Sequence, residues 1–418
     1  MNGAPILPPQ ARILAVKLAD IGDVLLCTPA LRALRARYPR ARIDLLTPPG
    51  SARVLEGAPE IDTVLVFDKF PFDTLASLTD AREWRRAAQF LVDLHRRRYD
   101  AVVVFHHFSL RFGALKFAAL TLATGAPRRV GLDNGRGWFL TSREPDVGFG
   151  ACHEAVYWLR LAARLGADPT PDDKGLTLPR NAADEAFVTA WLADRAIDSA
   201  RPLIAVHPGA GWYSPARRWP PGAFARLLAG LISQFQATII LVGGPDEVEL
   251  AAGIRARLPP AQQAAVHIAA GQTSVRQTAA LLGRCDLFIG NDSGPLHLAT
   301  AAGIPAIGIY GLSNWRAFGP IGRGPAPAGH AWGTTPEWIA SNPGPQPPTA
   351  LLAAPPATLV IRRDLPCQPC LYRGQDLGLR AGCGTRECLT ALPPTVVLDA
   401  AARMLAAVQR PATPGIIS

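Results

Sequence analysis

The sequence predicts an α/β protein of two domains, each built on an open parallel sheet that is covered by helices on both faces. Its 418 residues exceed what one ordinary core organises, and the 49% of hydrophobic residues are enough to fill two. Short apolar runs alternate with longer amphipathic stretches in two separate series. Such βαβ alternation is typical of parallel sheets between helical layers.

The first series fills residues 11–180 and predicts the N-terminal domain. Its predicted strands are residues 13–18, 43–46, 63–67 and 101–105, and its predicted helices are residues 24–37, 80–98 and 110–124. The strands are short and almost uniformly apolar, as expected of strands that are buried on both faces. Parallel pairing of these strands is therefore expected.

A second series predicts a C-terminal domain made of residues 200–318 and 367–409. Its predicted strands are residues 203–206, 238–242, 287–289 and 306–310, and its predicted helices are residues 223–234, 246–257, 274–283 and 296–302. Two open sheets in one chain leave a cleft where strand ends and helix starts face each other.

The connecting segments differ in composition from the two series. Residues 170–200 are polar at first and then lead through a helix near Ala183, so we place the interdomain link there. Residues 319–366 are rich in Pro, Gly and Ala without a period, which predicts an insertion that forms a long loop or is partly disordered. The tail after Gln409 is also expected to be loose.

The formal net charge of +10 suits an anionic substrate, a membrane surface or a nucleic acid, and does not choose among them. No stretch reaches the roughly 18–20 apolar residues that span a bilayer. The start, MNGAPILPPQAR, lacks a basic segment followed by a long apolar core, so no signal peptide is predicted and a cytoplasmic location is expected.

The first candidate site lies in VKLADIGDVLLCTPALRAL. A strand ends at Leu18, Gly22 and Asp23 occupy a short loop, and a helix is predicted from Val24. A carboxylate there is placed to take a proton from an attacking hydroxyl. The alternative is that Asp23 caps the helix. Lys17 either points at the same opening or keeps its ammonium group in solvent.

Two further segments follow strands of the second series. In AVHPGAGWYSPARRWP, His207 ends a strand and Arg217 and Arg218 close the following loop. Guanidinium groups offer the paired donors that diphosphate oxygens need, although a solvated basic loop is an equal alternative. In LVGGPDE, Gly243 permits close backbone approach, and an acidic residue after the glycines suits ribose hydroxyls. A simple turn explains the glycines as well.

The sharpest segment is CDLFIGNDSGPLHLATAAGIPAIGIYG. A strand ends before the loop that carries Asp292, Ser293 and Gly294, and Pro295 occupies a favoured first helical position. The N–H groups at this helix start, together with the helix dipole, predict a diphosphate site. His297 lies in the first helical turn and is either a donor to that group or a hydrogen-bonded packing residue.

Four cysteines cluster near the C-terminus at irregular spacing: Cys367, Cys370, Cys383 and Cys388. A structural zinc site with four thiolate ligands, an oxidisable pair and ordinary packing are all compatible with this pattern. The chain contains no P-loop, HExxH pair, GxSxG elbow or complete GxGxxG after the first strand, which argues against a kinase, zinc protease, esterase or simple dehydrogenase.

In their order along the chain, the motifs resemble those of glycosyltransferase family 9, the ADP-heptose:lipopolysaccharide heptosyltransferases. The resemblance rests on IGDVLLCTPALRAL, RRVGL, HEAVYWLRLAARLG, HPGAG with RRWP, LVGGPDE and NDSGPLHLATAAGIPAIGIYG. It implies a GT-B fold, with two Rossmann-like α/β/α domains facing across a cleft. It also implies inverting transfer from an ADP-sugar, without a required cofactor, onto a lipopolysaccharide core or related glycan.

The resemblance also assigns roles to individual residues. Asp23 becomes the general base in an acceptor-side domain. The resemblance places donor contacts at Arg217, Arg218, Glu247, Asp292, Ser293, Gly294 and His297, with Asp246 as the alternative to Glu247. From their positions at strand ends, Lys17, His207 and Gly243 are further predicted donor residues. Arg217 stands where many relatives carry Lys, and the stretch 319–366 is longer than the family pattern suggests.

The expected partners are a nucleotide sugar and an anionic glycolipid or oligosaccharide acceptor, without a nucleic acid. Basic residues such as Arg82, Arg85 and Arg86 suit peripheral contact with the inner face of the inner membrane, or are ordinary solvated helix charges. The alternatives for function are a related transferase with another nucleotide sugar, a nucleotide-sugar epimerase or isomerase, and a non-catalytic nucleotide-sugar-binding protein.

Overall fold

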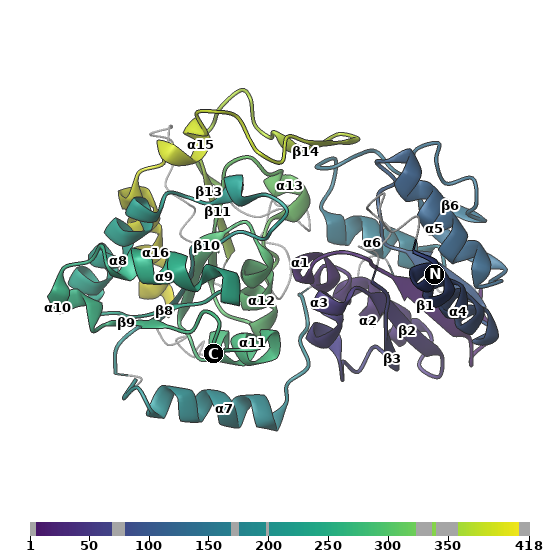
Figure 1. Ribbon diagram of the computed structural model, residues 1–418, viewed down its shortest axis with the longest axis horizontal. Coiled ribbons are helices and arrows are strands. Elements are labelled where there is room, and N and C mark those ends of the chain that lie inside the picture. The colour runs from purple at the N-terminus through teal and green to yellow at the C-terminus, as the bar shows by residue number, and fades with distance from the viewer. Residues whose placement is uncertain are drawn as a thin grey trace, which may run out of the picture. The chain divides into compact units, whose positions relative to one another are not determined.

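The structure is a computed structural model that describes residues 6–68, 80–168, 175–197, 200–322, 337–339 and 358–408. It divides into two compact units. One comprises Met1–Asp173 with Gly374–Asp376, and the other comprises Lys174–Arg373 with Leu377–Ser418. Both units are α/β (Figure 1). The tail after Gln409 lies outside the described residues, as does part of the predicted link at 170–200.

The first unit contains a six-stranded parallel sheet in the order β3-β2-β1-β4-β5-β6. Its strands are β1 (Arg12–Val16), β2 (Arg42–Thr47), β3 (Thr63–Val66), β4 (Ala101–Val104), β5 (Arg128–Asp133) and β6 (Ser142–Pro145). Ile13 pairs with Ile43 on one side and Ala101 on the other, and β1 and β4 are buried along nearly their whole length. This strand order is the Rossmann order.

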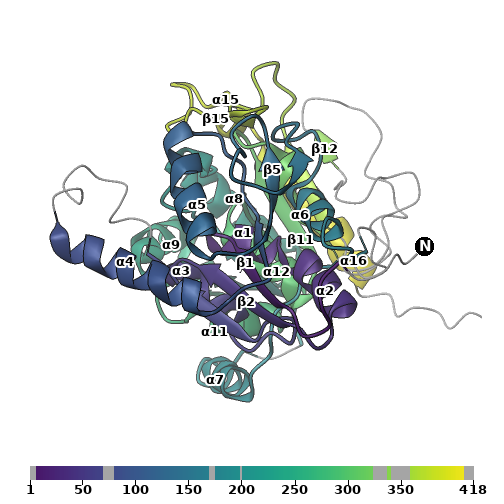
Figure 2. The ribbon, with the colours of Figure 1, turned by 90° about the vertical axis from the view of Figure 1, so that its right-hand side faces the viewer.

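Helices cover both faces of this sheet. They are α1 (Ile21–Leu25), α2 (Thr28–Arg37), α3 (Pro49–Ala52), α4 (Ala81–Arg96), α5 (Arg111–Ala123) and α6 (Glu154–Ala163), with a short 3-10 turn η1 (Arg53–Leu55). Figure 2 shows α4 and α5 on one side of β1 and β5, and α2 and α6 on the other. Val104, Leu94 and Phe117 belong to the hydrophobic cluster beneath α4 and α5.

The second unit contains a seven-stranded parallel sheet in the order β12-β13-β11-β10-β7-β8-β9. Its strands are β7 (Leu203–His207), β8 (Thr238–Leu241), β9 (Val266–Ile268), β10 (Leu287–Asn291), β11 (Ala306–Tyr310), β12 (Glu337–Ile339) and β13 (Thr358–Arg362). β7 and β10 are neighbours, with β8 and β9 on the β7 side and β11 on the β10 side. In the first unit, β1 and β4 are neighbours in the same way. A separate two-stranded sheet joins β14 (Leu371–Arg373) and β15 (Asp376–Gly378).

The helices of the second unit follow the strands in the same manner. They are α7 (Ala182–Ala193), α8 (Pro221–Phe235), α9 (Val248–Arg255), α10 (Pro260–Gln263), α11 (Val275–Leu282), α12 (Gly294–Ala302), α13 (Trp315–Phe318), α15 (Glu387–Thr390) and α16 (Pro394–Val408). Two 3-10 turns, η4 (Pro215–Arg217) and η5 (Pro245–Glu247), precede α8 and α9. In Figure 1, β10 and β11 lie between α8 and α16 on one side and α12 on the other.

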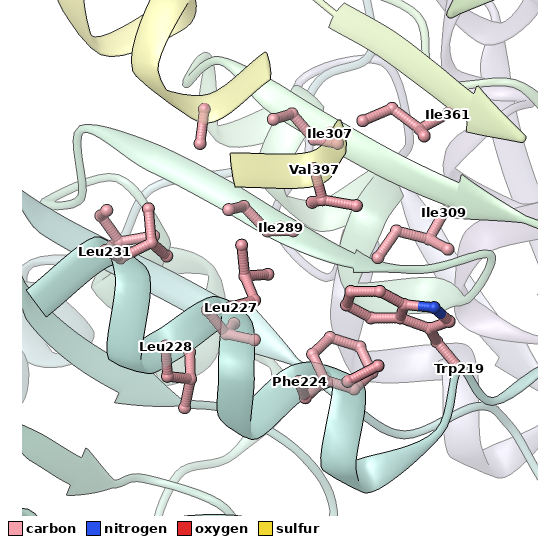
Figure 3. Close-up of a cluster of buried hydrophobic side chains, with 14 of the residues drawn as sticks. Trp219, Phe224, Leu227, Leu228, Leu231, Ile289, Ile307, Ile309, Ile361 and Val397 are labelled. Atoms are coloured by element: carbon pink, nitrogen blue, oxygen red, sulfur yellow. The ribbon is translucent and has the colours of Figure 1, made fainter. Parts of the chain in front are cut away.

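One apolar layer fixes α8 and α16 against the sheet. Phe224, Leu227 and Leu231 of α8 meet isoleucines of the central strands, and Val397 of α16 closes the cluster (Figure 3). Trp219, just before α8, is 1% exposed, and its indole N–H donates to the carbonyl of Leu392 at 3.2 Å. This packing anchors the segment that carries the two arginines of the predicted donor site.

Three predicted boundaries are wrong, and the first concerns helix 24–37. The structure has two helices there, and α1 begins at Ile21 after the N-cap Asp20, so Asp23 lies inside the first turn and does not cap the helix. Pro29 in the first turn of α2 has no N–H to donate to the carbonyl of Leu25, which instead accepts from the Thr28 hydroxyl at 2.7 Å.

The second correction concerns the insertion. Thr358–Arg362 lies within the range predicted as a loop or disordered, yet β13 pairs with β11 along its length and is largely buried. Residues 337–339 also form a strand, β12, beside β13. Residues 323–336 and 340–357 of this stretch lie outside the described residues. The Pro-rich flanks concealed a strand whose own sequence, TLVIR, is strongly apolar.

The third correction concerns strands that the prediction missed or cut short. Strands β5, β6 and β9 were not predicted, because β5 opens on two arginines, β6 alternates half-exposed and exposed residues, and β9 has only three residues. The predicted helix 246–257 begins instead as the turn η5 and continues as α9.

Candidate functional site

The two sheets share a topological feature that places functional side chains. Connections from β7 and β10 leave toward opposite faces of the second sheet, and β1 and β4 do the same in the first unit. In open α/β sheets, ligands bind outside the carboxyl ends of the strands at such a switch point. The residues that follow these four strands are therefore the candidates.

His207, the last residue of β7, bridges two other residues predicted for the donor site. Its Nδ1 lies 2.9 Å from the hydroxyl oxygen of Ser293, which follows β10, and its Nε2–H donates to Glu247 Oε2 at 2.9 Å. All three residues are buried. The switch point of the second sheet therefore joins three separate sequence motifs.

Glycines make room for the Glu247 carboxylate. A Cβ on Gly209 would collide with Oε1 of Glu247, and one on Gly243 would come within 2.6 Å of Oε2. The backbone N–H of Gly244 also donates to Oε2 at 3.0 Å. Burial raises the pKa of Glu247, but the His207 hydrogen bond and charge and the Gly244 N–H outweigh it, so the pKa is lowered.

The geometry separates the two acidic candidates of this motif. Glu247 faces His207, whereas Asp246 is exposed. The space over Gly243, which the sequence analysis left for a ligand, is occupied by the chain's own carboxylate.

Arg217 and Arg218 lie at the same end of the sheet. Arg217 Nη1 donates to Asp292 Oδ2 at 3.2 Å, and both side chains are largely buried. Burial and then the Asp292 carboxylate raise the pKa of Tyr310 well above its ordinary value, because both disfavour the tyrosinate. Arg218 is more exposed, and its Nη2 lies 3.9 Å from Glu247 Oε1.

Asn291 is a residue that the sequence analysis did not assign. It is fully buried at the end of β10, and its amide nitrogen donates to the carbonyls of Pro208 and Gly209 at 2.9 Å each. Its amide oxygen accepts from the backbone N–H of Trp219 at 3.0 Å. One side chain therefore fixes both loops that carry His207 and the arginines. The available signal was a polar residue at the end of an apolar strand.

The start of α12 has the character of an anion site. Ser293 is its N-cap residue, and within the described chain its hydroxyl makes no capping bond to the helix, donating instead to the carbonyl of Asn291 at 3.0 Å. Gly294 is the first helical residue, one position before the predicted Pro295. His297 is 4% exposed in the first turn. The helix dipole favours negative charge at this end.

In the first unit, Lys17 follows β1 and meets Asp23. The ammonium Nζ lies 3.2 Å from Asp23 Oδ1 and 4.4 Å from the ring centre of Trp158, and the Lys17 side chain is 3% exposed against 32% for Asp23. Burial lowers the pKa of Lys17, but the charges of Asp23, Cys27 and Glu154 outweigh it and the pKa is raised. The solvent-exposed alternative for Lys17 is therefore wrong.

A buried histidine lies behind this pair. His107 follows β4, and its ring nitrogens contact Asp146 Oδ1 at 2.9 Å and Glu154 Oε1 at 3.0 Å. Burial lowers the pKa of His107. Glu154 and Asp146 raise it by a larger amount, and the resulting pKa is about 9. The sequence analysis quoted Glu154 within a motif and gave none of these three residues a role.

The comparisons with known proteins agree with this geometry. The model of glycosyltransferase family 9 (heptosyltransferase) matches residues 88–333, more than half of the chain. The chain belongs to glycosyltransferase family 9. It is therefore a glycosyltransferase, and the epimerase alternative is not supported.

Individual relatives are similar over most of the chain. Lipopolysaccharide heptosyltransferase 2 of Salmonella typhimurium is 28% identical over 306 residues, which cover 72% of this chain and 83% of the relative. The Escherichia coli protein of the same name has the same identity and coverage. The relatives of this family 9 chain thus match it across both units.

Solved structures show the same fold. The structure of E. coli ADP-heptose lipopolysaccharide heptosyltransferase II has a TM-score of 0.66 at 22% identity and covers 94% of this chain and 98% of its own. E. coli heptosyltransferase WaaC with ADP-2-deoxy-2-fluoro heptose has a TM-score of 0.55 at 22% identity and covers 72% and 89%. The predicted GT-B fold is confirmed.

All predicted donor residues of this family 9 chain except Lys17 lie in the second unit. Lys17 lies in the first unit beside Asp23, while the other predicted donor residues lie in the second unit. A donor contact for Lys17 stays a prediction.

The cysteine cluster stays unassigned. Cys367, Cys370, Cys383 and Cys388 are free thiols, the first and third exposed and the last buried. Across the described ranges, no three His, Cys, Asp or Glu side chains are arranged to hold a metal ion. The zinc interpretation therefore gains no support from this geometry.

No helix in the same ranges is long and apolar enough to cross a membrane.

Proposed function

We propose that the chain transfers heptose from ADP-heptose onto a lipopolysaccharide core or related glycan, with inversion at the anomeric carbon. The observation that carries the proposal is the set of groups at the β7–β10 switch point, where Arg217 and the start of α12 supply positive charge and N–H groups and His207 fixes Glu247. Relatives named lipopolysaccharide heptosyltransferase support the sugar and the acceptor class.

In the proposed donor complex, the diphosphate lies at the start of α12, against Arg217 and Arg218. Asp292 holds Arg217 in place, and His297 donates to a phosphate oxygen. Glu247, fixed by His207 through Oε2, presents Oε1 to the ribose hydroxyls. A guanidinium pair and N–H groups stabilise the developing charge on the leaving ADP, so the reaction as proposed needs no added cofactor.

The proposed chemical step is a single displacement. The acceptor hydroxyl oxygen forms a bond to the anomeric carbon from the face opposite the nucleotide, and the bond from that carbon to the diphosphate oxygen breaks. The electron pair leaves with ADP, and the hydroxyl proton passes to the Asp23 carboxylate. Lys17 holds that carboxylate in place through the ion pair between its ammonium group and Asp23 Oδ1.

We further propose that the acceptor is carried by a lipid and that the enzyme meets it at the inner face of the inner membrane. The anionic groups of the lipid would be attracted by the basic helix α4. Six arginines lie between Arg82 and Arg98, and the last two of them follow the end of the helix.

The direct test incubates the purified protein with ADP-heptose and a Kdo-bearing lipid A acceptor, and identifies the product by mass spectrometry and its anomeric configuration by NMR. UDP- and GDP-sugars and ADP-glucose serve as competing donors. Transfer only from another nucleotide sugar would replace the donor assignment. Loss of transfer on adding EDTA, with recovery on adding zinc, would reopen the metal interpretation of the cysteine cluster.

A further inference from the structure

Apart from Arg111, Lys116 and the buried Thr121, the helix α5 consists of apolar residues and glycine, which is unusual for a helix with an exposed face. Its sequence is RFGALKFAALTLA, and its inner side buries Ala114, Phe117, Ala118, Leu120 and Thr121. Surface helices of globular proteins normally carry polar residues opposite the buried stripe. In α5, that opposite stripe is also apolar.

The outer stripe consists of large side chains at helical spacing. Phe112 is 59% exposed, Leu115 is 56% and Leu122 is 43%, and these positions lie within an arc of about 80° on a helix of 3.6 residues per turn. Leu110, immediately before the helix, is 61% exposed. Single exposed leucines are ordinary, but a continuous apolar stripe of this size marks an interaction surface.

Cations flank this stripe, and acidic residues are absent from the sequence between Ser109 and Pro127. Arg111 is exposed at the start of the helix, and Lys116 holds its ammonium group 4.6 Å from the ring centre of Phe112. Arg128 is exposed shortly after the helix ends. Long cationic side chains beside an apolar stripe can reach a charged layer while their stems stay in apolar surroundings.

The neighbouring helix α4 adds to this charge. Its His95 ring lies 3.2 Å from the carbonyl oxygen of Ala123, at the end of α5, and Figure 2 shows both helices on the same side of the first sheet. Arg96 and Arg98 follow His95 within three residues and are exposed, and Arg96 Nη1 lies 3.6 Å from Oδ1 of the exposed Asp93. Basic residues therefore lie near both ends of the apolar stripe.

This combination of an apolar stripe and flanking cations favours a lipid surface over a second copy of the chain as the binding partner. In a symmetric dimer through this face, Arg111 and Lys116 would lie close to the same cations of the other copy, which is unfavourable. A helix with Phe and Leu on one stripe and Arg and Lys beside it is typical of segments that lie in the interface of a bilayer with anionic lipids.

We propose that the outer stripe of α5, formed by Phe112, Leu115 and Leu122 with Leu110, docks on the surface of a bilayer that contains anionic lipids. The apolar side chains enter the boundary between headgroups and acyl chains, and Arg111 and Lys116 contact lipid phosphates. The biological reason rests on the proposed function, since a lipid-borne acceptor lies at such a surface. The docking itself requires no catalysis.

The test measures binding of the full chain to vesicles of phosphatidylglycerol and phosphatidylcholine by flotation. The wild type is expected to float with vesicles that contain 30% phosphatidylglycerol and to bind pure phosphatidylcholine about tenfold more weakly. The triple variant Phe112→Ser, Leu115→Ser and Leu122→Ser is expected to lose binding about tenfold or more. The double variant Arg111→Gln and Lys116→Gln should lose only the part of the vesicle binding that depends on anionic lipid.

Leu379→Ser provides the matched control, because Leu379 is 65% exposed and lies in the second unit. It should bind vesicles like the wild type, and unchanged circular dichroism should show that all variants are folded. Wild-type affinity in the triple variant would overturn the proposal. So would a wild-type dimer, seen by light scattering, that the triple variant converts to monomers without any vesicle binding.

A second measurement separates this proposal from the proposed function. The triple variant should transfer sugar normally to a soluble, lipid-free core oligosaccharide and poorly to the same acceptor in vesicles. Equal transfer to both acceptors by wild type and variant would refute docking and leave the function intact. Vesicle binding by the wild type without transfer to either acceptor would instead refute the function and leave docking intact.

Discussion

The ammonium Nζ of Lys17 lies 3.2 Å from Oδ1 of Asp23, and the two residues differ sharply in exposure: 3% for the Lys17 side chain and 32% for that of Asp23. A buried cation thus holds a carboxylate whose other side is open to solvent. Glu154, which contributes to the raised pKa of Lys17, lies 3.0 Å from His107. Asp23 is therefore the accessible end of a buried charged network.

Replacement of Asp23 by Asn should strongly lower the rate of transfer and leave donor binding intact. The amide keeps the size of the side chain but cannot accept the hydroxyl proton, and loss of a general base lowers the rate by roughly 10²- to 10⁴-fold. Turnover is measured with ADP-heptose and acceptor, and ADP affinity by calorimetry. Unchanged turnover would remove Asp23 as the base, and loss of ADP affinity would show that its role lies in donor binding.

Replacement of Lys17 by Met should damage both stability and turnover. Met fills much of the same space over Trp158 but leaves Asp23 and the buried Glu154 without their shared cation, which destabilises the folded chain. Thermal unfolding measures the first effect. Turnover should fall because Lys17 no longer holds the Asp23 carboxylate in place, and kcat with ADP-heptose and acceptor measures this second effect.

Lys17→Arg is the matched control, since it keeps the charge while changing the shape. It should restore kcat even where stability is incompletely recovered. A Lys17→Met variant that is less stable but has the wild-type kcat would assign Lys17 a purely structural role.

Much of the fold could be predicted because uniformly apolar runs report burial on both faces of a strand. β1, β4, β7 and β11 are such runs. The missed β5 opens on Arg128 and Arg129, and Arg129 directs its guanidinium to the carbonyls of Phe139 and Ala126. The start of the strand is therefore held by side-chain hydrogen bonds to the turns on either side of it, which periodicity does not reveal.

In the candidate site, too, the residues that could be predicted are those whose position follows from a local sequence pattern. Asp292, Ser293 and Gly294 could be predicted because a helix start after a strand is a local pattern. The inward orientation of Glu247 could not, because it depends on His207 and Gly209, some 40 residues earlier in the sequence. Asn291 was missed for the same reason, since its partners are carbonyls of another loop.

The buried His107 predicts a stability that depends on pH. The pKa of His107 is about 9 in the folded chain against about 6.5 unfolded, so its contribution is fully present below pH 6.5 and is lost as the pH rises through 9. At 1.36 kcal/mol per pKa unit, the loss is on the order of 3 kcal/mol. Asp146, whose pKa is lowered, acts only at acidic pH and does not mask this window.

The measurement is the melting temperature between pH 6 and pH 9 for wild type and for His107→Gln, whose side chain does not titrate. The variant should be less stable at pH 6 and show a smaller decrease toward pH 9. His95→Gln, a change at an exposed histidine, should keep the wild-type slope. An identical slope in the His107 variant would show that another group causes the dependence.

Replacement of Gly209 by Ala tests whether Glu247 must occupy its observed position. The added Cβ would collide with Glu247 Oε1, so the carboxylate must leave His207 or the loop must shift. We expect ADP affinity to fall about tenfold, which corresponds to about 1.4 kcal/mol. Gly222→Ala is the matched control, because a Cβ there meets only Arg226 Nη1 at 4.0 Å. Calorimetry that gives the same ADP affinity for both variants would show that donor binding does not depend on the His207–Glu247 contact.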